Sequence, residues 1–175
     1  YISSGQKEEY ELNLIDTPGH IDFSYEVSRA LKAVEGVLLL VDATQGVQAQ
    51  TLTTLGMAHS EGLAIIPVIS KIDMPNARVE EVTIEIVTLL SCVKEDVRLV
   101  SGKTGEGVRE LFDVICKKIP SPCKPMLDTF RGLIFDFQYS NHRGIIVFLR
   151  VFGGSVKKSD QLFFHAAKKS FTVLE

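Results

Sequence analysis

Short apolar runs alternate with amphipathic stretches through the first two thirds of the chain, and this order constrains the fold more than any other feature. Each run has the length of a strand; the runs occupy residues 10–15, 37–41, 65–69 and 97–100. The intervening stretches repeat apolar residues at helical spacing; they cover residues 23–34, 48–61, 79–90 and 107–119. This alternation predicts an α/β fold, in which helices cover both faces of a parallel sheet.

The apolar pattern changes after a proline-rich segment. Three prolines fall within residues 120–125, where they stiffen the backbone and remove amide donors. Beyond them apolar residues alternate with a period of two, as is typical of strands; this pattern covers residues 133–137, 145–152 and 161–164. We expect two domains, residues 1–122 and residues 123–175. The second is predicted to be the start of an antiparallel β-barrel with an aromatic core.

The composition excludes several classes of protein. Of the 175 residues, 45% are hydrophobic and 23% are charged, which is enough apolar material for a core. No apolar run approaches the roughly 18 to 20 residues that a membrane-spanning helix needs. The three cysteines lack CxxC spacing, which favours a reducing, intracellular compartment. Because the chain begins with Tyr and shows no secretory pattern, we expect it to be part of a larger protein.

Charge is distributed unevenly between the two parts. The net charge of −3 argues against a free-standing nucleic-acid binder. Residues 1–123 carry 11 basic and 18 acidic side chains, whereas residues 124–175 carry 8 basic and 4 acidic ones. The second part is therefore the one suited to face phosphate groups.

Three polar segments each follow a predicted strand. Residues 16–20 read Asp-Thr-Pro-Gly-His, residues 70–73 read Ser-Lys-Ile-Asp, and residues 101–105 read Ser-Gly-Lys-Thr-Gly. Because the carboxyl ends of parallel strands share one edge of a sheet, and ligands bind at that edge, we expect the three segments to converge.

The residue types in these segments suit nucleotide chemistry. Asp16 can hold Mg²⁺ through water, and Gly19 lets the backbone approach a phosphate. The Asp73 carboxylate can accept two hydrogen bonds from guanine, while the stem of Lys71 lies over the base. Residues 101–105 are not a phosphate-binding P-loop, because that motif needs a glycine where position 97 is Val.

Each segment also has a plainer interpretation. A bare D-x-x-G can be a turn that caps the helix beginning near Ser24, and S-K-x-D alone is more often a surface turn. The five-residue match that ends in His20 favours function for the first segment. Order and spacing decide the other two.

In that order and spacing, the chain resembles the GTPase domain of translational GTPases, where D-T-P-G-H, N-K-x-D and S-A-K follow one another. Within that family the wording of residues 16–31 and 45–51 is most similar to the elongation factor 4, or LepA-type, group. Residues 135–152 resemble the start of the second domain of that group. The resemblance covers almost the whole chain.

The resemblance implies a set of cofactors and roles. It implies GTP or GDP with Mg²⁺, the metal supported by Asp16. Gly19 would contact the γ-phosphate, and His20 would position the attacking water. The nucleotide-binding residues implied are Asp16, Thr17, Pro18, Gly19, Ser70, Lys71, Asp73, Ser101, Gly102 and Lys103. The implied partner is the ribosome, both its RNA and its proteins. The resemblance also implies that the protein is a monomer in the cytoplasm, with peripheral membrane association or an organelle location as further implications.

Two departures limit what the resemblance implies. Ser70 replaces the Asn of the family, so we expect weaker nucleotide affinity, and Gly102 replaces Ala. The 175 residues also contain neither a P-loop nor the switch threonine that the family carries in a separate segment. We therefore expect GTP hydrolysis only in a larger parent protein. Two alternatives stay open: another ribosomal GTPase such as a translocase, and a degenerate module that does not hydrolyse GTP.

Overall fold

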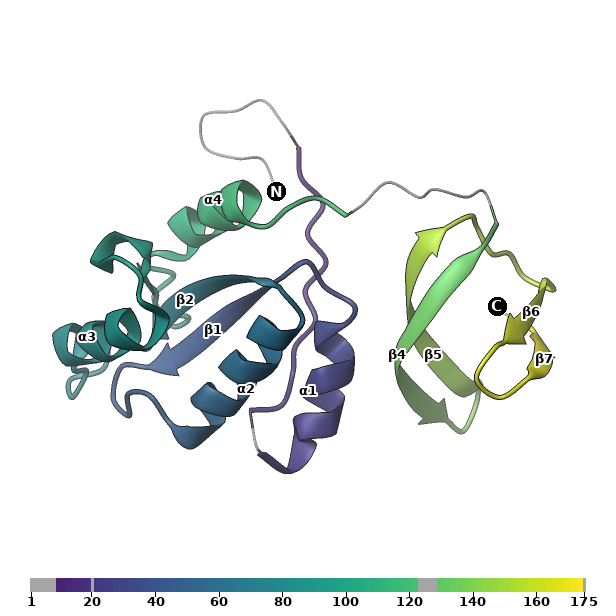
Figure 1. The fold of residues 1–175 in the computed structure, drawn as a ribbon, viewed down its shortest axis with the longest axis horizontal. Coiled ribbons are helices and arrows are strands. Elements are labelled where there is room, and N and C mark those ends of the chain that lie inside the picture. The colour runs from purple at the N-terminus through teal and green to yellow at the C-terminus, as the bar shows by residue number, and fades with distance from the viewer. Residues whose placement is uncertain (1–8, 20, 123–128, 175) are drawn as a thin grey trace. The chain divides into compact units, whose positions relative to one another are not determined.

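A three-stranded parallel sheet forms the centre of residues 1–122, and two of its strands, β1 and β2, are labelled in Figure 1. This computed structural model describes residues 9–19, 21–122 and 129–174. The strands are β1 (Gly36–Asp42), β2 (Ala64–Ser70) and β3 (Arg98–Leu99), in the order β1-β2-β3. Their parallel pairing confirms the predicted α/β class, and the third strand is shorter than expected.

Four helices occupy the predicted stretches: α1 (Ser24–Leu31), α2 (Ala49–Ser60), α3 (Val79–Leu90) and α4 (Val108–Lys118). Short 3₁₀ turns precede α1 and β3, at Ile21–Phe23 and Lys94–Asp96. Alternate residues of a strand point to opposite faces. Ile69 packs in the cluster that contains α3, while Val68 packs against α4, so these two helices cover opposite faces of the sheet.

The predicted strand at residues 10–15 is wrong. Residues 10–19 form no helix or strand, and Leu14 is 85% exposed. The period-two pattern of Tyr10, Leu12 and Leu14 suits a strand, but a strand exists only where a neighbour accepts its backbone hydrogen bonds. The three-stranded sheet does not include this segment.

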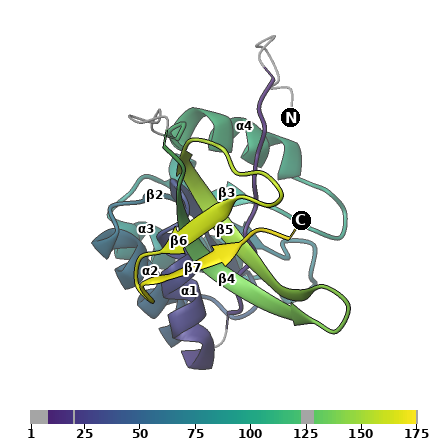
Figure 2. The ribbon, with the colours of Figure 1, turned by 90° about the vertical axis from the view of Figure 1, so that its right-hand side faces the viewer.

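Residues 123–175 form a separate unit of antiparallel hairpins. One hairpin pairs β4 (Arg131–Ser140) with β5 (Gly144–Gly153), and the other pairs β6 (Gln161–Phe164) with β7 (Lys169–Thr172). Figure 2 shows the second hairpin, in yellow, crossing in front of the first. The antiparallel class is confirmed.

The expected aromatic core of this second unit is wrong for the described residues. Six phenylalanines lie in the predicted strands at residues 133–137, 145–152 and 161–164. Five of them are exposed, namely Phe137, Phe148, Phe152, Phe163 and Phe164. Two hairpins with few strands cannot enclose side chains as a closed barrel does.

Within the described parts of the chain, no helix is long and apolar enough to cross a membrane.

Gly107 provides a test of the fold next to β3. Its φ of +71° is left-handed, and a Cβ there would lie 1.9 Å from the Leu99 carbonyl oxygen. We expect Gly107→Ala to lower the free energy of unfolding by about 3 kcal/mol. The matched control Gly56→Ala lies inside α2 with open space around it, and it should raise stability by about 0.5–1 kcal/mol. Urea denaturation measures both, and equal effects would contradict this account.

Candidate nucleotide-binding site

The loop after β2 leaves the sheet between its two neighbouring strands. Ser70, the last residue of β2, pairs in register with Asp42 of β1. Lys71 then adopts a left-handed backbone with φ of 60°, and its carbonyl accepts a hydrogen bond from the Met74 amide. This tight turn places Asp73, which is half-buried, two residues beyond Lys71.

Ser101, two residues after β3, joins the loop after β3 to the loop after β2. It is fully buried, and its hydroxyl donates a 2.6 Å hydrogen bond to Oδ1 of Asp73. The same Oγ accepts hydrogen bonds from the amides of Lys103 and Thr104. The structure therefore brings together the second and third predicted segments, and one buried serine fixes both.

Asp73 is ionised and keeps capacity to accept further hydrogen bonds. The hydrogen bond from Ser101 is the main cause that holds the pKa of Asp73 below its ordinary value, and the charge of Lys103 acts in the same direction. A carboxylate offers about four acceptor positions, of which Ser101 occupies one. Such a group suits a ligand that presents two adjacent N–H donors, as the edge of guanine does.

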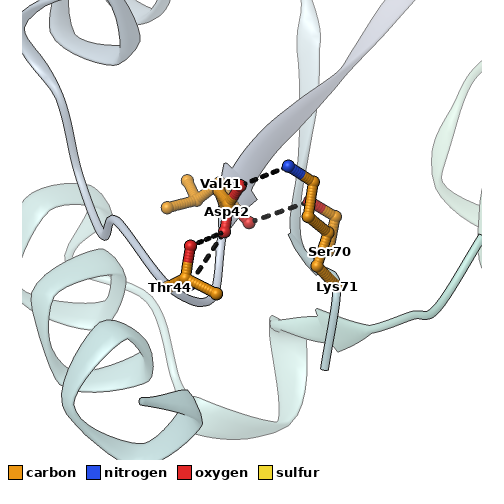
Figure 3. Close-up of polar contacts among 5 residues, drawn as sticks. All are labelled: Val41, Asp42, Thr44, Ser70 and Lys71. Carbon is orange, nitrogen blue, oxygen red and sulfur yellow. Dashed lines mark hydrogen bonds and ion pairs between the residues drawn. The ribbon is translucent and has the colours of Figure 1, made fainter. Parts of the chain in front are cut away.

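Asp42, the last residue of β1, is a site residue that the sequence analysis missed. Its Oδ2 lies 2.6 Å from the Lys71 ammonium nitrogen, and its Oδ1 accepts hydrogen bonds from the amide and hydroxyl of Thr44 at 2.8 and 2.7 Å (Figure 3). The bond from Lys71 is the main cause that lowers the pKa of Asp42 to about 2. A signal existed, since a polar residue at the end of each parallel strand lies at the same edge.

Ser70 uses its hydroxyl within the sheet. Its Oγ donates a 3.3 Å hydrogen bond to the carbonyl of Val41 in the neighbouring strand (Figure 3). In addition, the Ala43 amide donates to the Ser70 carbonyl at 2.9 Å. Ser70 therefore connects the ends of β1 and β2, while Lys71 of the same motif is exposed and Asp73 is half-buried.

The first predicted segment precedes α1 and is mostly exposed. Asp16, Pro18 and Gly19 are exposed and Thr17 is half-buried, while His20 lies outside the described residues. In the described part of the chain, no hydrogen bond or ion pair links residues 16–19 to the loops after β2 and β3.

A small cavity lies beside this segment. Pro18 and Gly19 line it together with residues of α1 and α2. Its volume is about 20 Å³, which has room for one water molecule. Among the residues that the structure describes, no cluster of three or more His, Cys, Asp or Glu side chains could hold a metal ion.

The low pKa of Asp42 predicts an acid-dependent contribution to stability. The pKa is about 2 in the folded chain against an ordinary 3.8, so the carboxylate stabilises the fold above pH 4 and this stabilisation is lost as the pH falls toward 2. We expect the difference in unfolding free energy between the wild type and Asp42→Asn to shrink over that range. Urea denaturation at several pH values measures it, and a difference independent of pH would contradict the ion pair.

Comparison with known proteins shows the family to which the chain belongs. Residues 2–121 match the family described as the elongation factor Tu GTP binding domain. Elongation factor 4 of Thermotoga maritima is 49% identical over 166 residues, which cover 95% of this chain and 27% of that protein. Elongation factor 4 of Parabacteroides distasonis is 52% identical over 164 residues, covering 94% of this chain and 28% of that protein. The chain thus spans little more than a quarter of the length of these relatives.

A solved structure gives the same result for the fold. The crystal structure of the bacterial selenocysteine-specific elongation factor is similar with a TM-score of 0.69 and 25% sequence identity. The similar region covers 90% of this chain and 28% of that one. Together these findings confirm the resemblance to translational GTPases that the motifs indicated. The chain belongs to the elongation factor Tu GTP-binding domain family, and within it is similar to elongation factor 4.

Proposed function

We propose that this chain is part of a ribosome-associated translation elongation factor that binds and hydrolyses GTP. Residues 1–122 would form the C-terminal part of its GTP-binding domain, and residues 123–175 the beginning of a second, barrel domain. The observation that carries the proposal is the hydrogen bond from buried Ser101 to Asp73, since it joins the two loops that would bind guanine. Family membership and similarity to elongation factor 4 support the rest.

The guanine base would bind at the edge formed by the loops after β2 and β3. Asp73 would accept hydrogen bonds from the base, and the stem of Lys71 would cover its flat face. The exposed backbone of Gly102 and the side chain of Lys103 would complete the contact. The Ser70 hydroxyl donates its hydrogen bond to the Val41 carbonyl of the neighbouring strand and not to a ligand. This supports the expectation that the nucleotide binds more weakly than it would with Asn at position 70.

The phosphates and the metal would bind at residues 16–20. Mg²⁺ is usually held by one or two carboxylates together with substrate phosphates, so the single exposed carboxylate of Asp16 fits that part. The ion would neutralise charge on the phosphates when bound. Thr17, Pro18 and Gly19 would follow the phosphate chain, with the Gly19 backbone nearest the terminal phosphate. His20 would orient the attacking water.

The partners follow from the same proposal. A translation factor acts on the ribosome. Resemblance to the elongation factor 4 group implies back-translocation or fidelity of elongation as the step affected, and this step is part of the proposal. A cytoplasmic monomer is part of this proposal, as is peripheral membrane association, which rests on resemblance alone. A translocase and a module that does not hydrolyse GTP are the competing functions.

A GTPase assay of the full-length protein, with and without ribosomes, tests the proposal. We expect ribosomes to stimulate hydrolysis, and His20→Ala to reduce the stimulated rate roughly a hundredfold, because positioned groups of this kind contribute that much. The matched control is His59→Ala, an exposed histidine in α2 outside the proposed site, which should leave the rate unchanged.

The other outcomes separate the alternatives. Nucleotide binding without hydrolysis would favour a degenerate module. Stimulated hydrolysis that survives in His20→Ala would remove His20 from the mechanism. A translocase would differ in the reaction that accompanies hydrolysis, namely forward movement of transfer RNA on the ribosome.

A further inference from the structure

We propose that Asp42 is a positioning residue for guanine recognition: its carboxylate holds the Lys71 ammonium group, so that the aliphatic stem of Lys71 is fixed where it can cover a bound base. This inference rests on the proposed function and deepens it. Asp42 lies in β1, outside the three segments that carry the motifs, and its carboxylate contacts the site through Lys71.

Lys71 needs an external constraint to act as a platform. Its side chain is 60% exposed, and a lysine stem in solvent occupies many rotamers. Its backbone is left-handed, a conformation that residues with a Cβ adopt only where the surroundings impose it. The contact between Nζ of Lys71 and Oδ2 of Asp42, at 2.6 Å, restricts the far end of the stem. The hydrogen bond from the Met74 amide to the Lys71 carbonyl restricts the near end.

Asp42 is itself held on a well-fixed loop. Thr44 saturates Oδ1 with two hydrogen bonds, which orients the carboxylate and leaves Oδ2 for Lys71. The backbone carbonyl of Asp42 accepts hydrogen bonds from Gln45 and Gly46. The loop is also tied to α3, because the Val47 amide donates a 2.9 Å hydrogen bond to the Glu85 carboxylate. Because the Asp42 side chain is only 17% exposed, its charge has a defined position.

The chain offers a matched ion pair that should have no such role. Asp96 in the 3₁₀ turn before β3 pairs with Lys118 at the end of α4. This pair has the same chemistry, yet it lies at the amino end of β3, whereas Asp42 lies at the carboxyl end of β1. Removing either charge perturbs one partly exposed ion pair, so a difference in nucleotide binding reports position rather than stability.

A double-mutant cycle in the full-length protein tests the inference by calorimetric titration with GDP. We expect Asp42→Asn to weaken GDP binding roughly tenfold, and the control Asp96→Asn to change it by less than about twofold. Lys71→Met keeps an apolar stem without a charge to hold, so adding Asp42→Asn to it should cause no further loss. A merely structural effect of Asp42 would persist in the Lys71→Met background and would overturn the inference.

Two further measurements test the inference independently of the Asp42→Asn variant. Should Asp42→Asn fail to fold by circular dichroism, Thr44→Val removes one hydrogen bond to the carboxylate and should weaken GDP binding about threefold. Unchanged affinity in that variant would overturn the inference while leaving the proposed function intact. A wild-type protein that binds GDP no better than ADP would overturn both, because no guanine site would then exist for Asp42 to support.

Discussion

Parallel pairing of β2 with both β1 and β3 is the constraint on which the rest of the site depends. It places the carboxyl ends of the three strands at one edge, where the chain supplies Asp42, the Ser70–Asp73 loop and Ser101 in neighbouring positions. Residues that are 28 and 29 positions apart in sequence thereby come within hydrogen-bond distance. The apolar residues of the strands hold this register, since Val41, Ile69 and Val68 are almost fully buried between helices.

The polar groups at this edge divide into those that build the loops and those that are available to a ligand. Ser101 is buried and uses its hydroxyl three times, twice as acceptor and once as donor. Ser70 and Thr44 similarly use their hydroxyls on neighbouring groups. Asp73 and Lys71 remain reachable, the former as an ionised acceptor and the latter as an exposed cation. A hydrogen-bonded layer, in which Ser101 is fully buried and Ser70 and Thr44 are half-buried, therefore supports the charged groups, as a preorganised binding surface requires.

The sequence predicted the parts of the fold that depend on local periodicity. The four helices and the strands β1 and β2 lie where apolar spacing placed them, and α3 has the predicted bounds. The error at residues 10–15 arose because a strand needs a partner, which periodicity cannot supply. The exposed phenylalanines of β4–β6 have the same origin, because a core depends on how many strands enclose it.

For the site, convergence of the second and third segments was predictable from the position of strand ends. The specific bond between Ser101 and Asp73 was not, because a serine after a strand does not reveal which way its hydroxyl points. The same rule, applied to the end of the apolar run at residues 37–41, points to Asp42. Convergence of residues 16–20 with these two loops on one nucleotide stays a prediction.

The most direct measurement of the central claim compares GDP with xanthosine diphosphate as ligands of the full-length protein and of its Asp73→Asn variant. Guanine presents two N–H donors to a carboxylate, whereas xanthine presents one donor and one carbonyl, which an amide matches. The account predicts that the wild type prefers GDP and that the variant prefers xanthosine diphosphate. A variant that retains the wild-type preference for GDP would contradict the claim that the loops after β2 and β3 bind the base through Asp73.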